Sequence, residues 1–246
     1  MVLKNMTKRT RLDQLLVEGG FFENIEKAKF AIASGMVKTD GQKITHTNAL
    51  TNSNSVISIT EQEKYVSRGG YKLEGFLKDI GANVKGKVAI DIGASTGGFT
   101  DCLLQAGVER VYAVDVGHGQ IAWKLRENQN VIVLEKENAR YKLSIDELVD
   151  IVVIDVSFIS VLKVLPNVLP LMKTKSDIFV LVKPQFEAKK EDVPRGGVID
   201  NPHIHAKTLQ NVSSWGRSNG LRFGGVKRSV ITGAKGNVEF FINFQK

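Results

Sequence analysis

The segment Val88-Ala-Ile-Asp-Ile-Gly-Ala-Ser-Thr-Gly-Gly-Phe-Thr100 constrains the fold of this chain more than any other. Its apolar run from Val88 to Ile92 predicts a buried strand, and the glycines over Gly93–Gly98 predict a tight turn before a helix that includes Phe99. Glycines let a ligand come close to the backbone, and the first turn of the next helix has free N–H groups. The segment therefore indicates a ligand-binding turn of an α/β fold.

Two carboxylates indicate which ligand this turn binds. Asp91 precedes the turn and would repel a pyrophosphate, and no Gly-Lys-Ser/Thr sequence of the phosphate-holding kind closes it. A carboxylate there suits a cationic ligand, such as the amino group or sulfonium of S-adenosyl-L-methionine. The next predicted strand, Val111–Asp115, ends in an acid placed for the two hydroxyls of an adenosine ribose. Together they predict an adenosine-type cofactor site, whereas the turn alone would also fit a generic nucleotide site or a plain βα turn.

The cofactor is expected to contact the glycine turn and the segments that follow three further strands. Asn138, after the predicted strand Val131–Leu134, is placed to line the adenine end of the pocket. The full set of expected cofactor-binding residues is Asp91, Gly93, Ser95, Thr96, Gly97, Gly98, Phe99, Asp115, Val116, Asn138 and Asp155.

Composition limits the partners and the compartment. The chain has 246 residues and a formal net charge of +8, which favours a polyanionic partner such as a nucleic acid. Its single cysteine, Cys102, allows no internal disulfide and fits a reducing compartment. No apolar run approaches a membrane span and no signal peptide is evident, so we expect a cytoplasmic protein. The four histidines and Cys102 are scattered, so no metal site is predicted.

The first 60 residues differ in pattern from the rest. A basic lead-in over Lys4–Arg11 has no apolar periodicity, and we expect it to be mobile until an acidic partner orders it. Two short amphipathic helices follow, separated by Gly19-Gly20, and then short strands around the turn Asp40-Gly41. The pattern predicts a small α+β domain over residues 1–60, a linker over 61–68 and a larger domain over 69–246.

This first segment resembles the small RNA-binding domain named after ribosomal protein S4. The matching residues are Arg11–Leu16, Lys27–Ile32, Ser34–Val37 and Asp40-Gly41, although Ile25 stands where that domain usually has an arginine. The resemblance implies a basic face against an RNA backbone, because basic side chains make most phosphate contacts. The alternative is a solvated basic face. The expected RNA-binding residues, one of them in the larger domain, are Lys8, Arg9, Arg11, Lys27, Lys29, Lys43 and Arg68.

From Tyr65 onwards, strand and helix patterns alternate. This alternation predicts a mostly parallel, doubly wound sheet that binds ligands at the carboxyl ends of its strands. A covering helix is expected over Ile159–Leu169, a mobile flap over Phe186–Asp200 and a last long helix over His205–Trp215. The seven predicted strands are Val88–Ile92, Val111–Asp115, Val131–Leu134, Ile151–Val156, Ile178–Lys183, Arg222–Val230 and Gly236–Phe244.

Four ionisable residues stand where the predicted site would form. Lys72 is near the start of a helix, Asp155 and Lys183 end two strands, and Glu239 lies in the last strand. The region around them resembles the FtsJ-type RNA ribose 2′-O-methyltransferases, and the whole chain is similar to the TlyA or haemolysin A family. The matching motifs are Ser67–Glu74, Asp91–Asp101, Ile154–Ser160, Val182–Glu187 and Lys235–Phe240.

The resemblance implies a Rossmann-like class I fold and methylation of ribosomal RNA by S-adenosyl-L-methionine. Its catalytic tetrad falls on Lys72, Asp155, Lys183 and Glu239. A ribose 2′-hydroxyl must lose its proton, or have its developing alkoxide stabilised, as it attacks the methyl group. Lys183 is the expected base and Asp155 orients it, while Lys72 holds the hydroxyl and Glu239 fixes the lysines.

Other interpretations stay open at this point. The four residues would also fit two structural salt bridges at strand ends. A non-catalytic RNA-binding or ribosome-assembly factor that binds S-adenosyl-L-methionine is an alternative function, against which intact Lys183 and Asp155 speak. A membrane-lysing protein, as one family name suggests, would need a membrane span or a long amphipathic helix, and the sequence offers neither.

Overall fold

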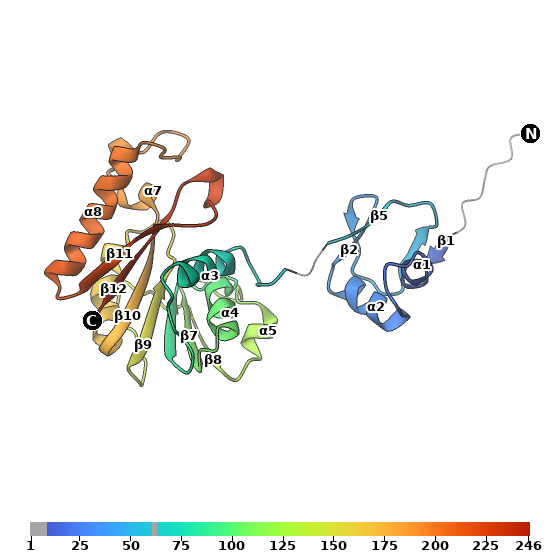
Figure 1. Cartoon of the computed structure of the whole chain (residues 1–246), viewed down its shortest axis with the longest axis horizontal. Helices are drawn as coiled ribbons and strands as arrows, with labels where there is room; N and C mark the ends of the chain where they lie inside the picture. Colours follow the sequence, from blue (N-terminus) through green and yellow to red (C-terminus); the bar gives the residue numbers. More distant parts are fainter. Residues whose placement is uncertain (1–8, 61–62) are drawn as a thin grey trace, which may run out of the picture. The chain divides into compact units, whose positions relative to one another are not determined.

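The computed structural model describes residues 9–60 and 63–246. The chain divides into two compact units, Met1–Lys64 and Tyr65–Lys246, and each is described by itself (Figure 1). Lys8, one of the expected RNA-binding residues, lies outside the described residues.

The N-terminal unit is a small α+β structure. Helices α1 (Leu12–Glu18) and α2 (Ile25–Ala33) pack on each other through buried side chains such as Leu16 and Ile32. A three-stranded antiparallel sheet has the order β3-β2-β5, with bounds Gln42–Lys43, Val37–Thr39 and Ile57–Ile59. Both predicted helices and the turn at Asp40-Gly41 are confirmed.

One expectation for this unit is wrong. Part of the lead-in that we expected to be mobile, Arg9–Arg11, forms strand β1 and pairs antiparallel with β4 (Leu50–Asn52). Arg11 also bonds the carboxylate of Asp13, with 2.6 Å between Nη2 and Oδ2. Strands of three residues have too little sequence pattern to predict, because alternation needs a longer run.

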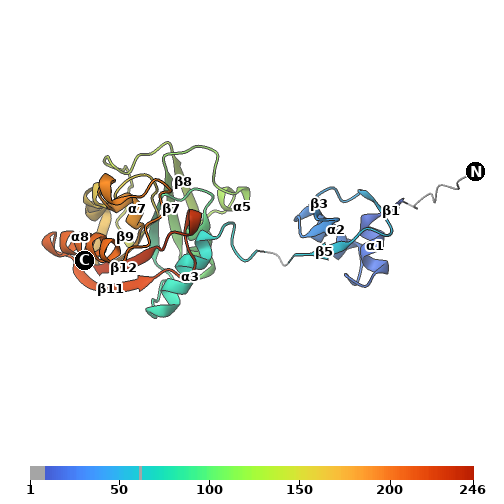
Figure 2. The same cartoon turned by 90° about the horizontal axis from the view of Figure 1, so that it is seen from above.

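The second unit is built on a seven-stranded sheet of order β11-β12-β10-β9-β6-β7-β8 (Figure 2). Neighbours from β8 to β10 pair in parallel, and β12 pairs antiparallel with both β10 and β11. The mostly parallel, doubly wound sheet is therefore confirmed. The strand bounds are β6 Val88–Ile92, β7 Arg110–Asp115, β8 Val131–Glu135, β9 Val149–Ile154, β10 Met172–Val182, β11 Arg222–Arg228 and β12 Phe240–Gln245.

Helices cover both faces of this sheet, since successive strand residues point to opposite sides. On one face Ala89 and Phe241 pack with α3 (Gly69–Asp79) and α4 (Gly98–Gln105), where Cys102 is buried as expected. On the other face Ile90 and Phe244 pack with α6 (Leu165–Val168) and α8 (Pro202–Ser218). The single turns α5 (Trp123–Arg126) and α7 (Pro184–Glu187) complete the α-helices of the described residues.

The structure differs from the sequence prediction in several places. The second unit begins at Tyr65, within the predicted linker, because the Tyr65 ring is buried and contacts the Tyr71 ring at 5.2 Å between centroids. The covering helix over Ile159–Leu169 is broken into η1 (Val161–Lys163), α6 and η2 (Leu169–Leu171). Strand β12 begins at Phe240, so Glu239 precedes it.

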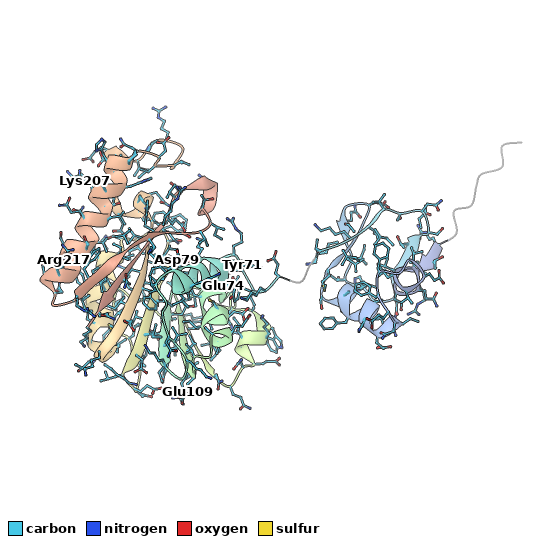
Figure 3. The ribbon with its side chains drawn as sticks, viewed as in Figure 1. Tyr71, Glu74, Asp79, Glu109, Lys207 and Arg217 are labelled. Carbon is cyan, nitrogen blue, oxygen red and sulfur yellow. The ribbon has the colours of Figure 1, made fainter. Side chains whose placement is uncertain are left out.

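The segment expected to be a mobile flap, Phe186–Asp200, contacts the rest of the unit at several points. It contains the end of α7 and the short η3 (Lys190–Asp192), and Asp192 lies 3.7 Å from Lys207, a residue of α8 that is labelled in Figure 3. At its far end, the buried Asn237 side chain accepts from Ile199 N and donates to Gly197 O, both at 3.0 Å.

Over the described residues, no helix is both long enough and apolar enough to cross a membrane. A search of the same residues for three or more clustered His, Cys, Asp or Glu side chains suited to a metal ion found none.

Candidate active site

The glycine turn brings the ends of strands β6 and β9 together. Gly93 has φ +86°, and a Cβ there would lie 2.5 Å from the carbonyl oxygen of Asp155. Only glycine fits both the conformation and the space. Asp155 is thereby held at the edge of the sheet where the chain order reverses between β6 and β9, the position at which doubly wound folds bind ligands.

A second close approach positions Lys72. A Cβ on Gly98 would overlap Ser67 Oγ and would lie 3.0 Å from the backbone nitrogen of Gly70. The N-termini of α3 and α4 can therefore pack directly against each other. Lys72, in the first turns of α3, faces the cavity that forms above the glycine turn.

Two adjoining cavities lie along this edge of the sheet, with volumes of about 550 and 390 Å³. They share the lining residues Gly93, Ser95, Asp155 and Ser157, so they form one continuous cleft of the size that cofactors occupy. Expected residues that line the larger cavity are Lys72, Gly93, Ser95, Thr96, Gly98, Phe99, Asp155, Lys183 and Arg68. Those that line the smaller one are Gly93, Ser95, Asp115, Val116, Asn138 and Asp155.

Asp115 is held in a fixed orientation in the smaller cavity. Its Oδ2 accepts a hydrogen bond from Ser95 N and its Oδ1 accepts one from Gly117 N, both at 2.7 Å. Each carboxylate oxygen keeps further acceptor capacity. The arrangement suits a ligand that donates two neighbouring hydroxyls, such as a ribose.

Asp91 lies beneath the turn and is not among the residues that line either cavity. It is fully buried, and its Oδ2 accepts a 2.7 Å bond from Thr100 Oγ1. In the described part of the chain, Oδ1 has no hydrogen-bond partner. Burial raises the pKa of Asp91, and the nearby Asp155 charge adds to the effect, while the Thr100 hydrogen bond lowers it. The result is a pKa of about 7. Gly97 does not line the cleft either, and a Cβ on it would overlap Leu125.

Lys183 and Asp155 form one ion pair of the site. Lys183 directly follows β10 and Asp155 directly follows the neighbouring parallel strand β9. Lys183 Nζ lies 2.6 Å from Asp155 Oδ1 and donates to Ser157 Oγ at 2.8 Å. The lysine is therefore held at the cleft wall by two oxygens from one loop.

Lys72 and Glu239 form the second ion pair, with 2.6 Å between Nζ and Oε2. Glu239 is buried behind Lys72 and does not itself line the cleft. Its carboxylate occupies space that a Cβ on Gly233 would fill. Three of the four residues of the predicted tetrad thus line one cavity, and the fourth, Glu239, forms an ion pair with Lys72.

Phe158 is a site residue that the sequence analysis missed. It lies in the smaller cavity's wall, its side chain is 92% exposed, and its backbone has φ +63°. A large residue in the left-handed region is uncommon and marks a constrained position. Its ring is 5.2 Å from that of Phe186, whose centroid is 5.9 Å from Lys183 Nζ. No sequence pattern predicts that a phenylalanine will adopt the left-handed backbone conformation.

The expected RNA-binding residues of the N-terminal unit are largely paired with acids. Lys27 pairs with Glu23, which precedes α2, and Lys29 pairs with Glu26 within α2. Such surface pairs are worth little energy. Arg11 pairs with the buried carboxylate of Asp13. Arg9 and Lys43 are exposed on β1 and β3, and Arg68, in the second unit, donates to Thr232 O at 2.9 Å beside the larger cavity.

Comparison with known families covers most of the chain. The model of the FtsJ-like methyltransferase family matches residues 65–246. YqxC of Bacillus subtilis (strain 168), which bears an rRNA methyltransferase name, is 44% identical over 247 residues, covering 96% of this chain and 86% of that protein. TlyA of Mycobacterium tuberculosis (strain ATCC 25618 / H37Rv), named a 16S/23S rRNA (cytidine-2′-O)-methyltransferase, is 40% identical over 241 residues, covering 96% and 90%.

A solved structure gives the same result for the fold. A Streptococcus thermophilus protein that bears a hemolysin name superposes with a TM-score of 0.73 at 37% identity. The match covers 98% of this chain and 89% of that one.

Proposed function

Because this chain belongs to the FtsJ-like methyltransferase family, we propose that it methylates ribose 2′-hydroxyls of ribosomal RNA. The methyl donor is S-adenosyl-L-methionine. The TlyA relative is named for 2′-O-methylation of rRNA cytidines, which supports this substrate. The observation that carries the proposal is the Lys183–Asp155 ion pair in the wall of the cleft formed by the glycine turn.

The residues of the cleft fit the cofactor. Asp115 presents a carboxylate whose orientation is fixed, Asn138 adds an amide beside it, and the glycines keep the floor of the turn free of side chains. Asp91 is buried under the turn with one unpaired oxygen, and when it is ionised its negative charge complements a cationic ligand. When bound, S-adenosyl-L-methionine supplies an electrophilic methyl group on its sulfonium.

The two lysines have different proposed roles at the ribose 2′-hydroxyl. Lys183 takes the proton of the attacking ribose oxygen once it has given up the proton that it holds in the ion pair, while Asp155 and Ser157 fix the position of its Nζ. Lys72 stabilises the negative charge that develops on that oxygen. Glu239 holds Lys72 in place through their buried ion pair. The catalytic groups need only small motions, because each lysine is already oriented by an oxygen partner.

The RNA is proposed to approach over the exposed ring of Phe158. RNA-modifying proteins commonly stack an unpaired base on an aromatic side chain, and Phe158 is exposed in the wall of the cleft. The N-terminal unit is proposed to be an S4-like domain that adds backbone contacts through its basic residues, among them Arg9 and Lys43. The reaction would then take place in the cytoplasm, with ribosomal subunits as partners.

The test is transfer of tritium from labelled S-adenosyl-L-methionine to ribosomal subunits. Small and large subunits are purified separately from cells that lack this protein, incubated with the full chain and digested with alkali. Label in an alkali-resistant dinucleotide is expected, because a 2′-O-methyl group blocks cleavage at that ribose. Label that alkali releases as mononucleotides would place the methyl group on a base and contradict the proposal, as would the absence of label from both subunits.

A further inference from the structure

A carboxylate outside the predicted tetrad joins the two loops that carry Lys183 and Asp155. Glu187 is the last residue of α7, the helical turn that directly follows Lys183. Its Oε2 accepts a 2.6 Å hydrogen bond from Ser160 Oγ, and its Oε1 accepts one from Val161 N at 2.8 Å. Both donors lie at the end of the loop that begins with Asp155.

Asp155 and Lys183 directly follow strands β9 and β10, and the loops that they begin continue beyond the sheet. The parallel pairing of β9 and β10 ends at Ile154 and Val180, before either catalytic side chain is reached. Beyond it, the loops are joined at one end by Lys183, through Asp155 and Ser157, and at the other by Glu187. The Phe158 and Phe186 rings meet between these two connections. Asp155 N donates to Ile92 O, and β10 pairs with β12 as far as Val182, so the sheet holds the strand ends. The loops beyond these ends, including Ser157, are held together by the two connections.

The Glu187 connection is part of a small network of hydrogen bonds that fixes its geometry. Ser160 is the N-cap of η1, where its Oγ accepts from Leu162 N at 3.2 Å while donating to Glu187. Glu187 is half-buried, and burial raises its pKa, although the two hydrogen bonds favour the ionised form. A carboxylate in such surroundings is costly unless its bonds are made, so the loops are held in the arrangement that makes them.

We propose that Glu187 is a positioning residue for methyl transfer, which sets Lys183 against Asp155 and Ser157 by clamping their loops together through Ser160. The proposal rests on the proposed function, in which Lys183 is the base. Glu187 touches no reacting atom. Its effect on the rate passes through the position of Lys183 Nζ.

The first test measures the single-turnover rate of methyl transfer at saturating cofactor and RNA. Glu187→Ala is expected to slow this rate at least about tenfold, because small misplacements of a catalytic group are expensive. The Kd for S-adenosyl-L-methionine, measured by calorimetry, should change less than about twofold. Glu187→Gln should recover most of the rate, since its amide oxygen still accepts from Val161 N. Glu191→Ala, at an exposed carboxylate of the same segment, is the matched control and should keep the full rate.

A double-mutant cycle tests whether Ser160 is the partner that matters. If both residues act through one bond, Ser160→Ala should slow the Glu187→Ala protein no further. Losses that multiply would overturn the clamp, as would a full rate in Glu187→Ala. Loss of cofactor binding or of cooperative unfolding in Glu187→Ala would overturn it too, because the residue would then support the whole domain.

A second readout does not depend on activity. Trace acetylation with acetic anhydride, followed by mass spectrometry, reports how accessible each lysine amine is. Lys183 should react several times faster in Glu187→Ala than in the unchanged protein, with Lys72 unaffected. Equal labelling of Lys183 in both would contradict the clamp even if no RNA were methylated. An unchanged protein that methylates no RNA, but shows the labelling difference, would refute the proposed function alone.

Discussion

Lys72 and Glu239 are 167 positions apart in the sequence and form a buried ion pair with 2.6 Å between Nζ and Oε2. The pair joins α3 to the segment before β12, so it connects the first helix of the second unit to its last strand. Removing two charges from water is costly, and each charge depends on the other for compensation. Lys72 is thereby held at the cleft.

Loss of the Glu239 carboxylate should therefore affect both folding and activity. We expect Glu239→Ala to lower the free energy of unfolding by about 3–5 kcal/mol, because Lys72 is left buried without a partner. Replacing both members, as in Lys72→Met with Glu239→Leu, should restore much of that stability but no methyl transfer. Urea denaturation and the tritium assay measure the two effects. Activity in the double variant would show that the pair is only structural.

Gly233 makes room for the Glu239 carboxylate, and this relationship can be tested with a single methyl group. A Cβ on Gly233 would overlap Glu239 Oε1, whereas one on Gly196 meets no atom within 4 Å. Gly233→Ala should cost about 1–3 kcal/mol of stability through overpacking. It should slow methyl transfer roughly a hundredfold if Lys72 shifts by about 1 Å. Gly196→Ala is the matched control, and an equal loss in both variants would argue against the assigned role of Gly233.

The buried Asp91 predicts a pH dependence of stability. Its pKa is about 7 in the folded protein, so between about pH 4 and pH 7 the folded state holds a proton that the unfolded state has released. The stabilisation from this group is complete below about pH 4 and is lost as the pH rises through 7. The difference amounts to about 4 kcal/mol, from the pKa of about 7 and 1.36 kcal/mol per pH unit.

Asp91→Asn removes this titration, so the variant should not lose this stability as the pH rises from about 4 to 7. The difference in unfolding free energy should therefore shift in favour of the variant over this range. Denaturant unfolding at several pH values, without added cofactor, measures the difference between the two proteins. Calorimetry should also show that Asp91→Asn binds S-adenosyl-L-methionine more weakly. Parallel stability curves over this range would mean that Asp91 is ionised in the fold at neutral pH.

The sequence predicts the parts of the site that lie at the ends of apolar runs. Asp155 and Lys183 follow two such runs, and parallel strands place their carboxyl ends at one edge, so their proximity was predictable. The Gly93–Gly98 turn was predictable because it directly follows the apolar run Val88–Ile92. The resemblance, rather than any pattern, indicated that Glu239 pairs with this region, since nothing local links it to Lys72.

Contacts between loops were beyond prediction from residue types. The Glu187–Ser160 bond joins residues 27 positions apart in two irregular segments, where no periodicity fixes the geometry. Likewise, the lysines of α2 are paired with Glu23 and Glu26, which the expected basic face did not include. Phe158 became visible only through its backbone conformation and exposure.

Phe158 should influence RNA recognition through its exposed ring. A base stacked on an aromatic ring contributes about 1–3 kcal/mol, so Phe158→Ala should raise the KM for the ribosomal substrate roughly 5- to 150-fold. Phe158→Trp keeps a stacking surface and should stay near the original value. Steady-state methyl transfer with varied RNA measures both variants. An unchanged KM in Phe158→Ala would place the target base elsewhere.

The most direct test of the central claim compares the unchanged protein with Lys183→Ala and Lys183→Arg, using mass spectrometry of nucleosides from the methylated RNA. The unchanged protein should produce a 2′-O-methyl nucleoside. Both variants should be slower by about 10²- to 10⁴-fold, the usual contribution of a general base, because arginine keeps the charge but cannot give up a proton. Cofactor binding should persist in all three proteins. A methyl group on a base, or Lys183→Arg working at the original rate, would contradict the account.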